Sequence, residues 1–340
     1  MPDRARCLLI LAALVIAAPS AFAAQPGQPS PFDTAWTEYA DETNGKGLQF
    51  GCQPRRYQPP PGVERIGTVV AFHGFSACPQ QYFQLGPLLA TQGFDVLVPM
   101  LPGHGLKRLP DGQEQLDELP TSANWRKRYG GLAARMNDIA ALAPGQRVIV
   151  GYSLGGTLAL NAAFRAPELY DRMLLIAPLI RINVPAYLET VINVAGGTPV
   201  LRNWQPKPPS MEEDCDNWTA SGRAGFCDYS LKYLPPLVKL ERQNREWQRK
   251  TPLALPLFVI LADNDVVVSN PAIREFVDLQ SEHGSIELCE LTGGVPHEIL
   301  TPYENAGREM FWLPKFIQVA STFVTRGETS RCRAPNPPTP

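Results

Sequence analysis

The chain has 340 residues, of which 44% are hydrophobic and 9% aromatic, so it is long enough to form one large domain or two modest ones with a packed core. Its formal net charge is −2, and neither sign of charge forms a long run, which excludes the charge pattern typical of a nucleic-acid groove. We therefore expect a globular protein that has no nucleic-acid partner.

Residues 1–24 have the pattern of a secretory signal peptide. Arg4 and Arg6 precede an apolar run over residues 8–18 that is too short to span a bilayer comfortably, and residues 19–24 end in an Ala-x-Ala pattern that signal peptidase cleaves. This pattern predicts a periplasmic or secreted protein with no membrane span after cleavage. An uncleaved membrane anchor is the alternative.

The six cysteines that follow this leader predict disulfides, since an even number in an exported protein favours pairing. Six cysteines allow 15 pairings. Closure of the short polar stretch between Cys215 and Cys227 is the first pairing that we expect; the others are Cys289 with Cys332, and Cys52 with Cys78. The cysteine spacing does not match a zinc site, and we expect neither a metal nor an organic cofactor.

Residues 151–156 (Gly-Tyr-Ser-Leu-Gly-Gly) lie between a β-branched run that predicts a strand and an apolar run that predicts a helix. A strand, a Gly-x-Ser-x-Gly turn and a helix together form the nucleophile elbow of an α/β-hydrolase. The turn is so sharp that side chains at Gly151 and Gly155 would collide with the neighbouring backbone. The elbow predicts Ser153 as nucleophile, with the backbone N–H of Leu154 facing the oxyanion.

The rest of the chain alternates between apolar runs and helical spacing, which predicts a mostly parallel sheet with helices on both faces. Strands are expected over residues 48–57 (one strand or a pair), 67–72, 94–99, 147–150, 173–177, 257–261 and 285–291, and helices over 82–92, 124–142, 157–164, 271–280 and 301–325. Pro314 is expected to kink or break the last of these helices.

We expect six segments along the chain. They are a signal peptide (1–24), a linker or N-terminal segment (25–47), a first core part (48–181), an inserted lid or cap (182–250), a second core part (251–325) and a flexible tail (326–340). The lid is expected because the stretch before the strand at 257 is much longer than a βαβ crossover requires and contains apolar helical pieces. A disordered insertion is the alternative.

A serine hydroxyl needs a base, and the base needs an orienting carboxylate. In this fold they follow the serine in the order acid, then histidine, at the carboxyl ends of later strands. Asp263 and Asp265 both leave the strand at 257–261; we choose Asp265 as the acid and expect Asp263 to brace the loop or bind a lid residue. His297 follows the last strand and is the expected base, with His283 as its competitor.

The loop after the strand at 67–72 is expected to supply the second oxyanion donor, the backbone N–H of Phe75. For His73 we favour a structural role in shaping this loop over proton transfer. His104 is expected to organise its own loop.

The chain resembles the α/β-hydrolase superfamily and is most similar to its monoacylglycerol lipase, lysophospholipase and carboxylesterase branch. The resemblance rests on residues 73–75 (His-Gly-Phe), 102–105 (Pro-Gly-His-Gly), 151–156, 265–268 (Asp followed by three valines) and His297, and it covers residues 67–325. The family often has glycine three residues before the acid, where this chain has Ala262. The leader, the extra cysteines and the tail are not part of the family pattern.

These observations predict an exported serine hydrolase that cleaves carboxylic esters, such as those of medium-chain acids or monoacylglycerols, with transient lipid contact through the lid. A thioesterase, a lactonase and a serine peptidase on the same fold remain alternatives, as does a binding protein that has no catalytic activity.

Overall fold

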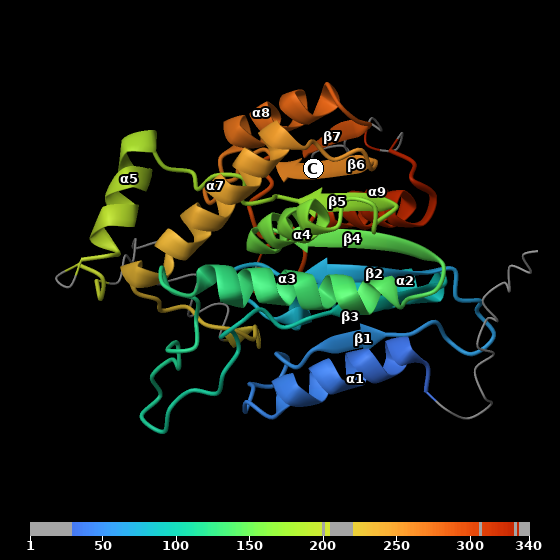
Figure 1. Cartoon of the computed structure of the whole chain (residues 1–340), viewed down its shortest axis with the longest axis horizontal. Helices are drawn as coiled ribbons and strands as arrows, with labels where there is room; N and C mark the ends of the chain where they lie inside the picture. Colours follow the sequence, from blue (N-terminus) through green and yellow to red (C-terminus); the bar gives the residue numbers. More distant parts are fainter. Residues whose placement is uncertain (1–28, 199–200, 205–219, 306–307, 330–331, 333–340) are drawn as a thin grey trace, which may run out of the picture.

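The computed structural model describes residues 29–198, 201–204, 220–305, 308–329 and 332 of the chain. A single sheet lies at the centre, and helices cover both of its faces (Figure 1). The strands are β1 (Arg55–Tyr57), β2 (Gly67–Phe72), β3 (Phe94–Val98), β4 (Gln146–Tyr152), β5 (Arg172–Ile176), β6 (Leu257–Ala262) and β7 (Ile286–Leu291). The helices are α1 (Pro31–Asn44), α2 (Leu85–Thr91), α3 (Trp125–Ala141), α4 (Leu154–Arg165), α5 (Ala186–Ala195), α7 (Pro235–Lys250), α8 (Asn270–Ser281) and α9 (Leu313–Arg326), with short 3₁₀ turns η1 (Pro79–Tyr82), η2 (Leu231–Tyr233) and η3 (Pro302–Glu304).

The strand order in the sheet is β1-β3-β2-β4-β5-β6-β7, with β1 antiparallel to β3 and all other pairs parallel. The predicted mostly parallel sheet is therefore confirmed. The chain passes from β2 to β3 on one side and then returns to place β4 on the other side of β2. Such a reversal of strand order opens a crevice at the carboxyl ends of the strands, where ligands bind in folds of this kind.

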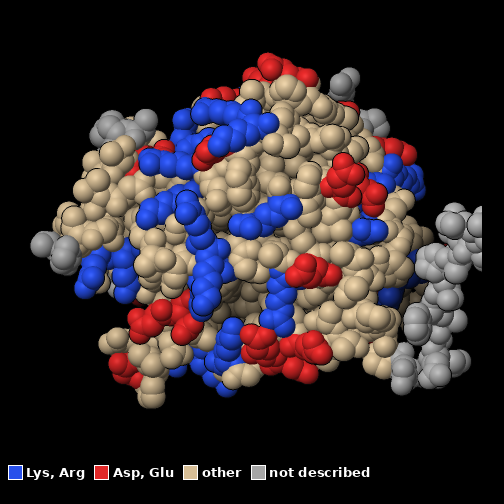
Figure 2. Space-filling model, viewed as in Figure 1, with Lys and Arg blue, Asp and Glu red and all other residues tan. Residues whose placement is uncertain are grey.

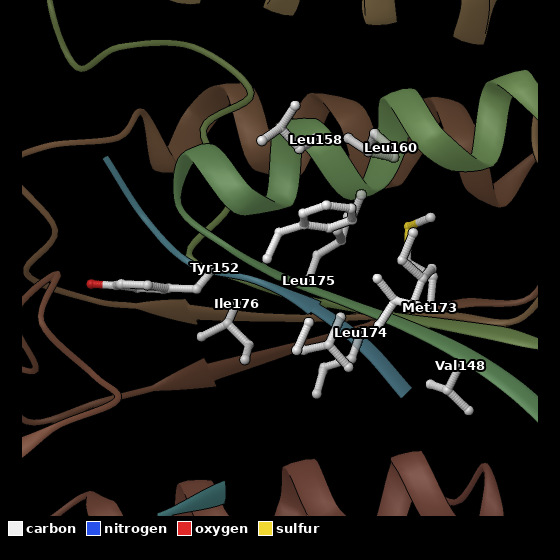
Figure 3. Packing of buried hydrophobic residues seen from close by; sticks show 14 of the residues in the cluster. Val148, Tyr152, Leu158, Leu160, Met173, Leu174, Leu175 and Ile176 are labelled. Atoms are coloured by element: carbon white, nitrogen blue, oxygen red, sulfur yellow. The ribbon is translucent and has the colours of Figure 1, made fainter. Parts of the chain in front are cut away.

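The sheet is largely buried because helices cover it on both sides. Every residue of β2, β3 and β6 is buried, and apolar residues predominate on both faces of these strands rather than alternating with polar ones. Figure 1 shows α3, α4, α7 and α8 on one face and α2 and α9 on the other. Figure 3 shows apolar side chains of β4, β5 and α4 gathered in this core.

Helix α1 lies within the segment 25–47, which was expected to be a linker or N-terminal segment and for which the sequence predicted no helix. Ser30 and Asp33 form a capping box at its start. Phe32, Trp36 and Tyr39 then follow one another on one face of the helix and are buried. The short apolar stripe is easily overlooked in a polar, proline-flanked stretch, but it contributes directly to the core.

The last predicted helix is wrong in its first half. Residues 301–312 contain the short turn η3 and irregular backbone, and α9 begins only at Leu313. Pro314 lies in the first turn of α9, where a proline lacks no hydrogen bond that the helix would otherwise make. It therefore starts the helix and does not kink it.

Two further boundaries differ from the expected ones. In the stretch 48–57 only β1 is a strand, and Leu48 forms an isolated bridge with Leu106. The helix expected over 82–92 is divided into η1 and α2.

In the described part of the segment predicted to be a lid, helices α5 and α7 have different surroundings. Helix α7 packs against α4, and the side chain of Asn244 donates a hydrogen bond to the backbone oxygen of Thr157 (2.7 Å) and accepts one from Asn161 (3.0 Å). Helix α5 projects from the body of the molecule (Figure 1). Arg242 of α7 pairs with Glu189 of α5 (3.0 Å).

The outer surface of α7 is basic. Figure 2 shows Lys and Arg side chains gathered across the face formed by α3 and α7. Arg126, Lys239 and Arg242 line one hollow of this face, and Arg245 and Arg249 line the next. Charged residues outside and packing residues inside are the pattern of a helix in a surface layer.

Two of the predicted disulfides are confirmed: Cys52 with Cys78, and Cys289 with Cys332. The third predicted pairing lies outside the described residues, because Cys215 does. The predicted signal peptide (1–24) and most of the predicted tail also lie outside them. Within the part of the chain that the structure describes, a helix long and apolar enough to cross a membrane is not found.

The bridge between Cys289 and Cys332 generates a first testable prediction. Replacing both cysteines with alanine should lower the free energy of unfolding by about 2–4 kcal/mol, because the bridge restricts the unfolded chain over a long loop. Urea denaturation followed by circular dichroism measures this. Glu328→Ala, an exposed change in the same tail, is the control and should leave the midpoint unchanged. A double variant as stable as the wild type would contradict the prediction.

Candidate active site

Ser153 lies on the turn between β4 and α4 in a backbone conformation that residues other than glycine rarely adopt. Its φ is 53° and its ψ is −121°. A Cβ atom at Gly151 would lie 2.3 Å from the backbone oxygen of Gly155, and one at Gly155 would lie 2.0 Å from the backbone oxygen of Phe72. The two glycines are therefore required by close backbone contacts, as the sequence predicts.

Three side chains from different loops meet at this turn. The Nε2 atom of His297 lies 3.0 Å from the Oγ atom of Ser153, and its Nδ1 atom lies 2.6 Å from Oδ2 of Asp265. The carboxylate of Asp265 is fully buried, and its Oδ1 accepts the backbone N–H groups of Val267 and Val268 (both 2.9 Å). Because the carboxylate of Asp265 can only accept, Nδ1 of His297 carries the proton and donates it in this hydrogen bond. Nε2 of His297 is then able to accept the hydroxyl proton of Ser153.

Asp263 has a different task two residues earlier. Its carboxylate accepts hydrogen bonds from the backbone N–H groups of Gly293 (2.8 Å), Gly294 (3.1 Å) and Val295 (2.7 Å). These residues form the loop that leads to His297. The prediction that Asp263 braces a loop is confirmed, and the braced loop is that of the histidine.

Tyr152 is a residue of this site that the sequence analysis missed. Its hydroxyl donates a hydrogen bond to the backbone oxygen of His297 (2.8 Å), and its ring stacks on the imidazole at 5.3 Å between centroids. Figure 3 shows the ring of Tyr152 pointing out of the apolar cluster at the end of β4. The available signal was its position beside Ser153 in the elbow motif.

The pKa of His297 is raised above its ordinary value of 6.5 by its surroundings. Burial is the largest single effect and lowers the pKa, but the charge of Asp265, the hydrogen bond to it and the nearby glutamates together raise the pKa by more. The charges of Glu298 and Glu304 add to the increase. The site therefore stabilises the imidazolium that forms when the imidazole accepts a proton.

The two expected oxyanion donors belong to segments that adjoin Ser153. Leu154 is the first residue of α4, where backbone N–H groups have no partner within the helix. Phe72, the last residue of β2, pairs with Gly151 of β4, so the loop that carries Phe75 begins beside the elbow. A Cβ atom at Gly74 would lie 3.4 Å from the Cβ atom of Ser153, which measures how closely this loop approaches.

The other histidines do not contact Ser153. The ring nitrogens of His73 are used by backbone groups, Nδ1 with the oxygen of Gly74 (2.9 Å) and Nε2 with the N–H of Leu101 (3.1 Å). Burial lowers the pKa of His73 and lowers that of His104 to about 4, so both imidazoles are neutral. The structural role expected of His73 is confirmed. His104 bonds the oxygen of Pro102 in its own loop (3.1 Å), and His283 is exposed after α8.

This arrangement has the chemistry of nucleophilic acyl transfer. A hydroxyl bonded to an imidazole that a buried carboxylate orients can be deprotonated as it attacks a carbonyl. Among the described residues, groups of three or more His, Cys, Asp or Glu side chains suited to holding a metal are not found.

Comparison with known proteins identifies a family and similar folds. Residues 64–303 match the model of the Hydrolase_4 family, described as serine aminopeptidase, S33. A solved monoacylglycerol lipase from Paleococcus ferrophilus is similar at a TM-score of 0.58 and 15% identity, over 81% of this chain and 98% of that one. A thermostable carboxyl esterase from Bacillus coagulans is similar at 0.59 and 16% identity, over 80% of this chain and 93% of that one.

A curated protein is also similar in sequence. The type I acyl-CoA thioesterase mpaH of Penicillium roqueforti is 28% identical over 127 residues, which is 35% of this chain. The match spans 28% of the length of that curated relative.

Removal of the Asp263 carboxylate tests the bracing of the histidine loop. In Asp263→Ala three backbone N–H groups lose their acceptor, which should lower the free energy of unfolding by about 1–3 kcal/mol. Amide hydrogen exchange at residues 293–295 should become faster. Asn264→Ala is the matched control, because Asn264 contacts this loop through its backbone N–H. Unchanged exchange at these three amides in Asp263→Ala would show that the contacts do not hold the loop.

Proposed function

This chain belongs to the serine aminopeptidase S33 family of the α/β-hydrolase superfamily, and from this premise we propose that it is a serine hydrolase of carboxylic esters. We assign the nucleophile to Ser153, the base to His297 and the acid to Asp265. The observation that carries the proposal is the imidazole of His297, which joins the hydroxyl of Ser153 (3.0 Å) to the buried carboxylate of Asp265 (2.6 Å).

In the proposed reaction His297 removes the proton of Ser153 as the serine oxygen attacks the ester carbonyl. The oxyanion of the tetrahedral intermediate accepts hydrogen bonds from the backbone N–H groups of Leu154 and Phe75. The imidazolium then protonates the leaving alcohol, and an acyl group remains on Ser153. Water, deprotonated by the same imidazole, releases the acid and restores the serine. Each step uses only groups of this chain, the ester and water.

For the substrate we propose small acyl esters, such as those of medium-chain acids or monoacylglycerols. Solved structures of a monoacylglycerol lipase and a carboxyl esterase share this fold, which makes these substrates a reasonable choice for the first assay.

We also propose that part of the segment 182–250 covers the site and touches lipid transiently. Exposed apolar side chains on and after α5, namely Val191, Val194, Leu201 and Trp204, support this.

A thioester is the second candidate substrate. The sequence match to an acyl-CoA thioesterase favours it, and a serine acyl-enzyme forms equally well from a thioester. Hydrolysis of an octanoyl ester, an octanoyl thioester, an octanoyl amide and a lactone of the same carbon number by the same preparation distinguishes esterase, thioesterase, peptidase and lactonase. We expect kcat/KM to be highest for the ester.

We further propose that the protein is exported to the periplasm or secreted. The charged and apolar pattern of residues 1–24 supports export, and so do the two disulfides, because disulfides persist in oxidising compartments. Mass spectrometry of the protein from the periplasmic and culture fractions tests this: a mature N-terminus near residue 24 is expected, and a full-length chain confined to the cytoplasm would contradict it.

The nucleophile is tested by Ser153→Ala. Loss of the attacking oxygen should reduce p-nitrophenyl ester hydrolysis by at least about 10⁴-fold and abolish labelling by a fluorophosphonate, while the circular dichroism spectrum stays the same. Ser281→Ala, at the end of α8, is the matched control and should retain full activity. A Ser153→Ala variant as active as the wild type would remove Ser153 from the mechanism.

The raised pKa of His297 predicts the pH dependence. Only the neutral imidazole can accept the serine proton, so kcat/KM should rise with pH through a midpoint above 6.5 and should be lost as the pH falls below that midpoint. Because the charge of Glu298 contributes to the increase, Glu298→Gln should move the midpoint to lower pH. A midpoint below 6.5 in the wild type, or a shift to higher pH in the variant, would contradict this assignment.

A further inference from the structure

Residues 221–226 form a short segment in the second half of the predicted lid, before α7, and lie against two loops of the candidate site. The N–H of Phe226 donates a hydrogen bond to the backbone oxygen of Ser76 (2.9 Å), and the N–H of Ala224 donates one to Oε1 of Gln80 (2.7 Å). A Cβ atom at Gly225 would lie 2.0 Å from the oxygen of Ser76. The 221–226 segment therefore packs directly on the loop that follows β2.

Arg223 is the central side chain of this segment. Its Nε lies 3.1 Å from Oε1 of Glu304, and its Nη2 donates a hydrogen bond to Oγ of Ser76 (3.0 Å). The side chains of Arg223 and Glu304 are only 6% and 4% exposed. The planar guanidinium, with its donors in fixed directions, thus joins two groups that are distant in sequence.

Glu304 belongs to η3, in the loop that follows His297. The same Oε1 atom accepts a hydrogen bond from Nε2 of Gln81 (2.8 Å), and Oε1 of Gln81 accepts the backbone N–H of Gly74 (2.8 Å). Glu304 is therefore connected to Gly74 through Gln81 and to Ser76 through Arg223. These two connections reach the residues immediately before and after Phe75.

The backbone around Phe75 needs such support. Ser76 has a φ of 62°, in the left-handed region that residues other than glycine rarely occupy. The ring of Phe75 packs edge-on against Phe226 (5.3 Å) and Tyr229 (5.1 Å), so its side chain is also held by residues that follow Arg223. Hydrogen bonds and ring contacts therefore restrain the chain on both sides of Phe75.

We propose that Arg223 is a positioning residue for the oxyanion site: with Glu304 and Gln81 it orients the loop 74–76 so that the N–H of Phe75 points at the developing oxyanion. The inference rests on the proposed function, because it requires that Ser153 forms a tetrahedral intermediate. It also assigns the 221–226 segment to the fixed part of the site and not to a moving cover.

The test is Arg223→Met, which replaces the aliphatic stem of the side chain with one of similar length and removes the guanidinium donors. Loss of a whole oxyanion donor costs about 10²–10³ in rate, so a misdirected donor should lower kcat about 10–100-fold, with KM within about threefold. A trifluoromethyl ketone forms a tetrahedral adduct with the serine, and its inhibition constant should rise by the same factor as kcat/KM falls. All rates are expressed per site titrated with a fluorophosphonate, so misfolded protein does not contribute.

Two further variants sharpen the result. Arg223→Lys keeps the charge but lacks the forked guanidinium donors that bond both Glu304 and Ser76. Its kcat should lie between that of Arg223→Met and that of the wild type. Arg274→Met removes a different ion pair, the more exposed one with Glu290, and should leave kcat and inhibitor affinity unchanged. If Arg223→Met does not fold, Ser76→Gly removes the Oγ contact and suits the positive φ, and it should lower kcat about 3–10-fold.

The outcomes separate this inference from the proposed function. Wild-type kcat and inhibitor affinity per titrated site in Arg223→Met, or in Ser76→Gly where the first variant does not fold, would overturn the role of Arg223. A wild-type protein that neither hydrolyses esters nor reacts with the fluorophosphonate would instead contradict the serine hydrolase mechanism itself.

Discussion

The close approach of the turn at Gly155 to the end of β2 is the constraint on which the site depends. The backbone of Gly155 lies so near the oxygen of Phe72 that a Cβ atom would be 2.0 Å from it. This contact holds Ser153 at the end of β4 with a φ of 53°, a conformation that the surrounding structure must maintain. Because β2 and β4 are adjacent parallel strands, the loop after β2 begins beside Ser153.

Asp263 and Asp265, which follow β6, position His297 in different ways. Asp263 accepts backbone N–H groups of residues 293–295 and so determines the path of the loop. Asp265 reaches the imidazole itself. Both carboxylates lie on one short loop after β6, and both reach the loop after β7 because β6 and β7 are neighbouring parallel strands whose carboxyl ends lie together. Asp263 contacts the backbone of that loop, and Asp265 contacts the side chain of His297. Tyr152 completes the support from the side of β4.

The long connection between β5 and β6 contains parts with different structural roles. Helix α7 belongs to the helical layer, since Asn244 bonds α4. The 221–226 segment contributes the buried ion pair between Arg223 and Glu304. Burying two charges costs free energy that their attraction does not always recover, so such a pair is retained more readily for a geometric requirement than for stability. Helix α5 projects from this framework (Figure 1).

The sequence alone was sufficient for what is encoded over a few neighbouring residues. It predicted the buried strands, the glycines of the elbow, the meeting of Ser153 with His297 and Asp265, and two disulfides, because chain order and strand ends limit where these residues can lie. It did not predict α1, whose apolar stripe is short, or the start of α9 at Leu313. Only the tertiary structure decided that Arg223 meets Glu304, which lies 81 residues away, and that both support the loop around Phe75. The periodicity of a sequence reports which face of an element is buried, whereas a contact between two irregular loops depends on the packing of the whole chain.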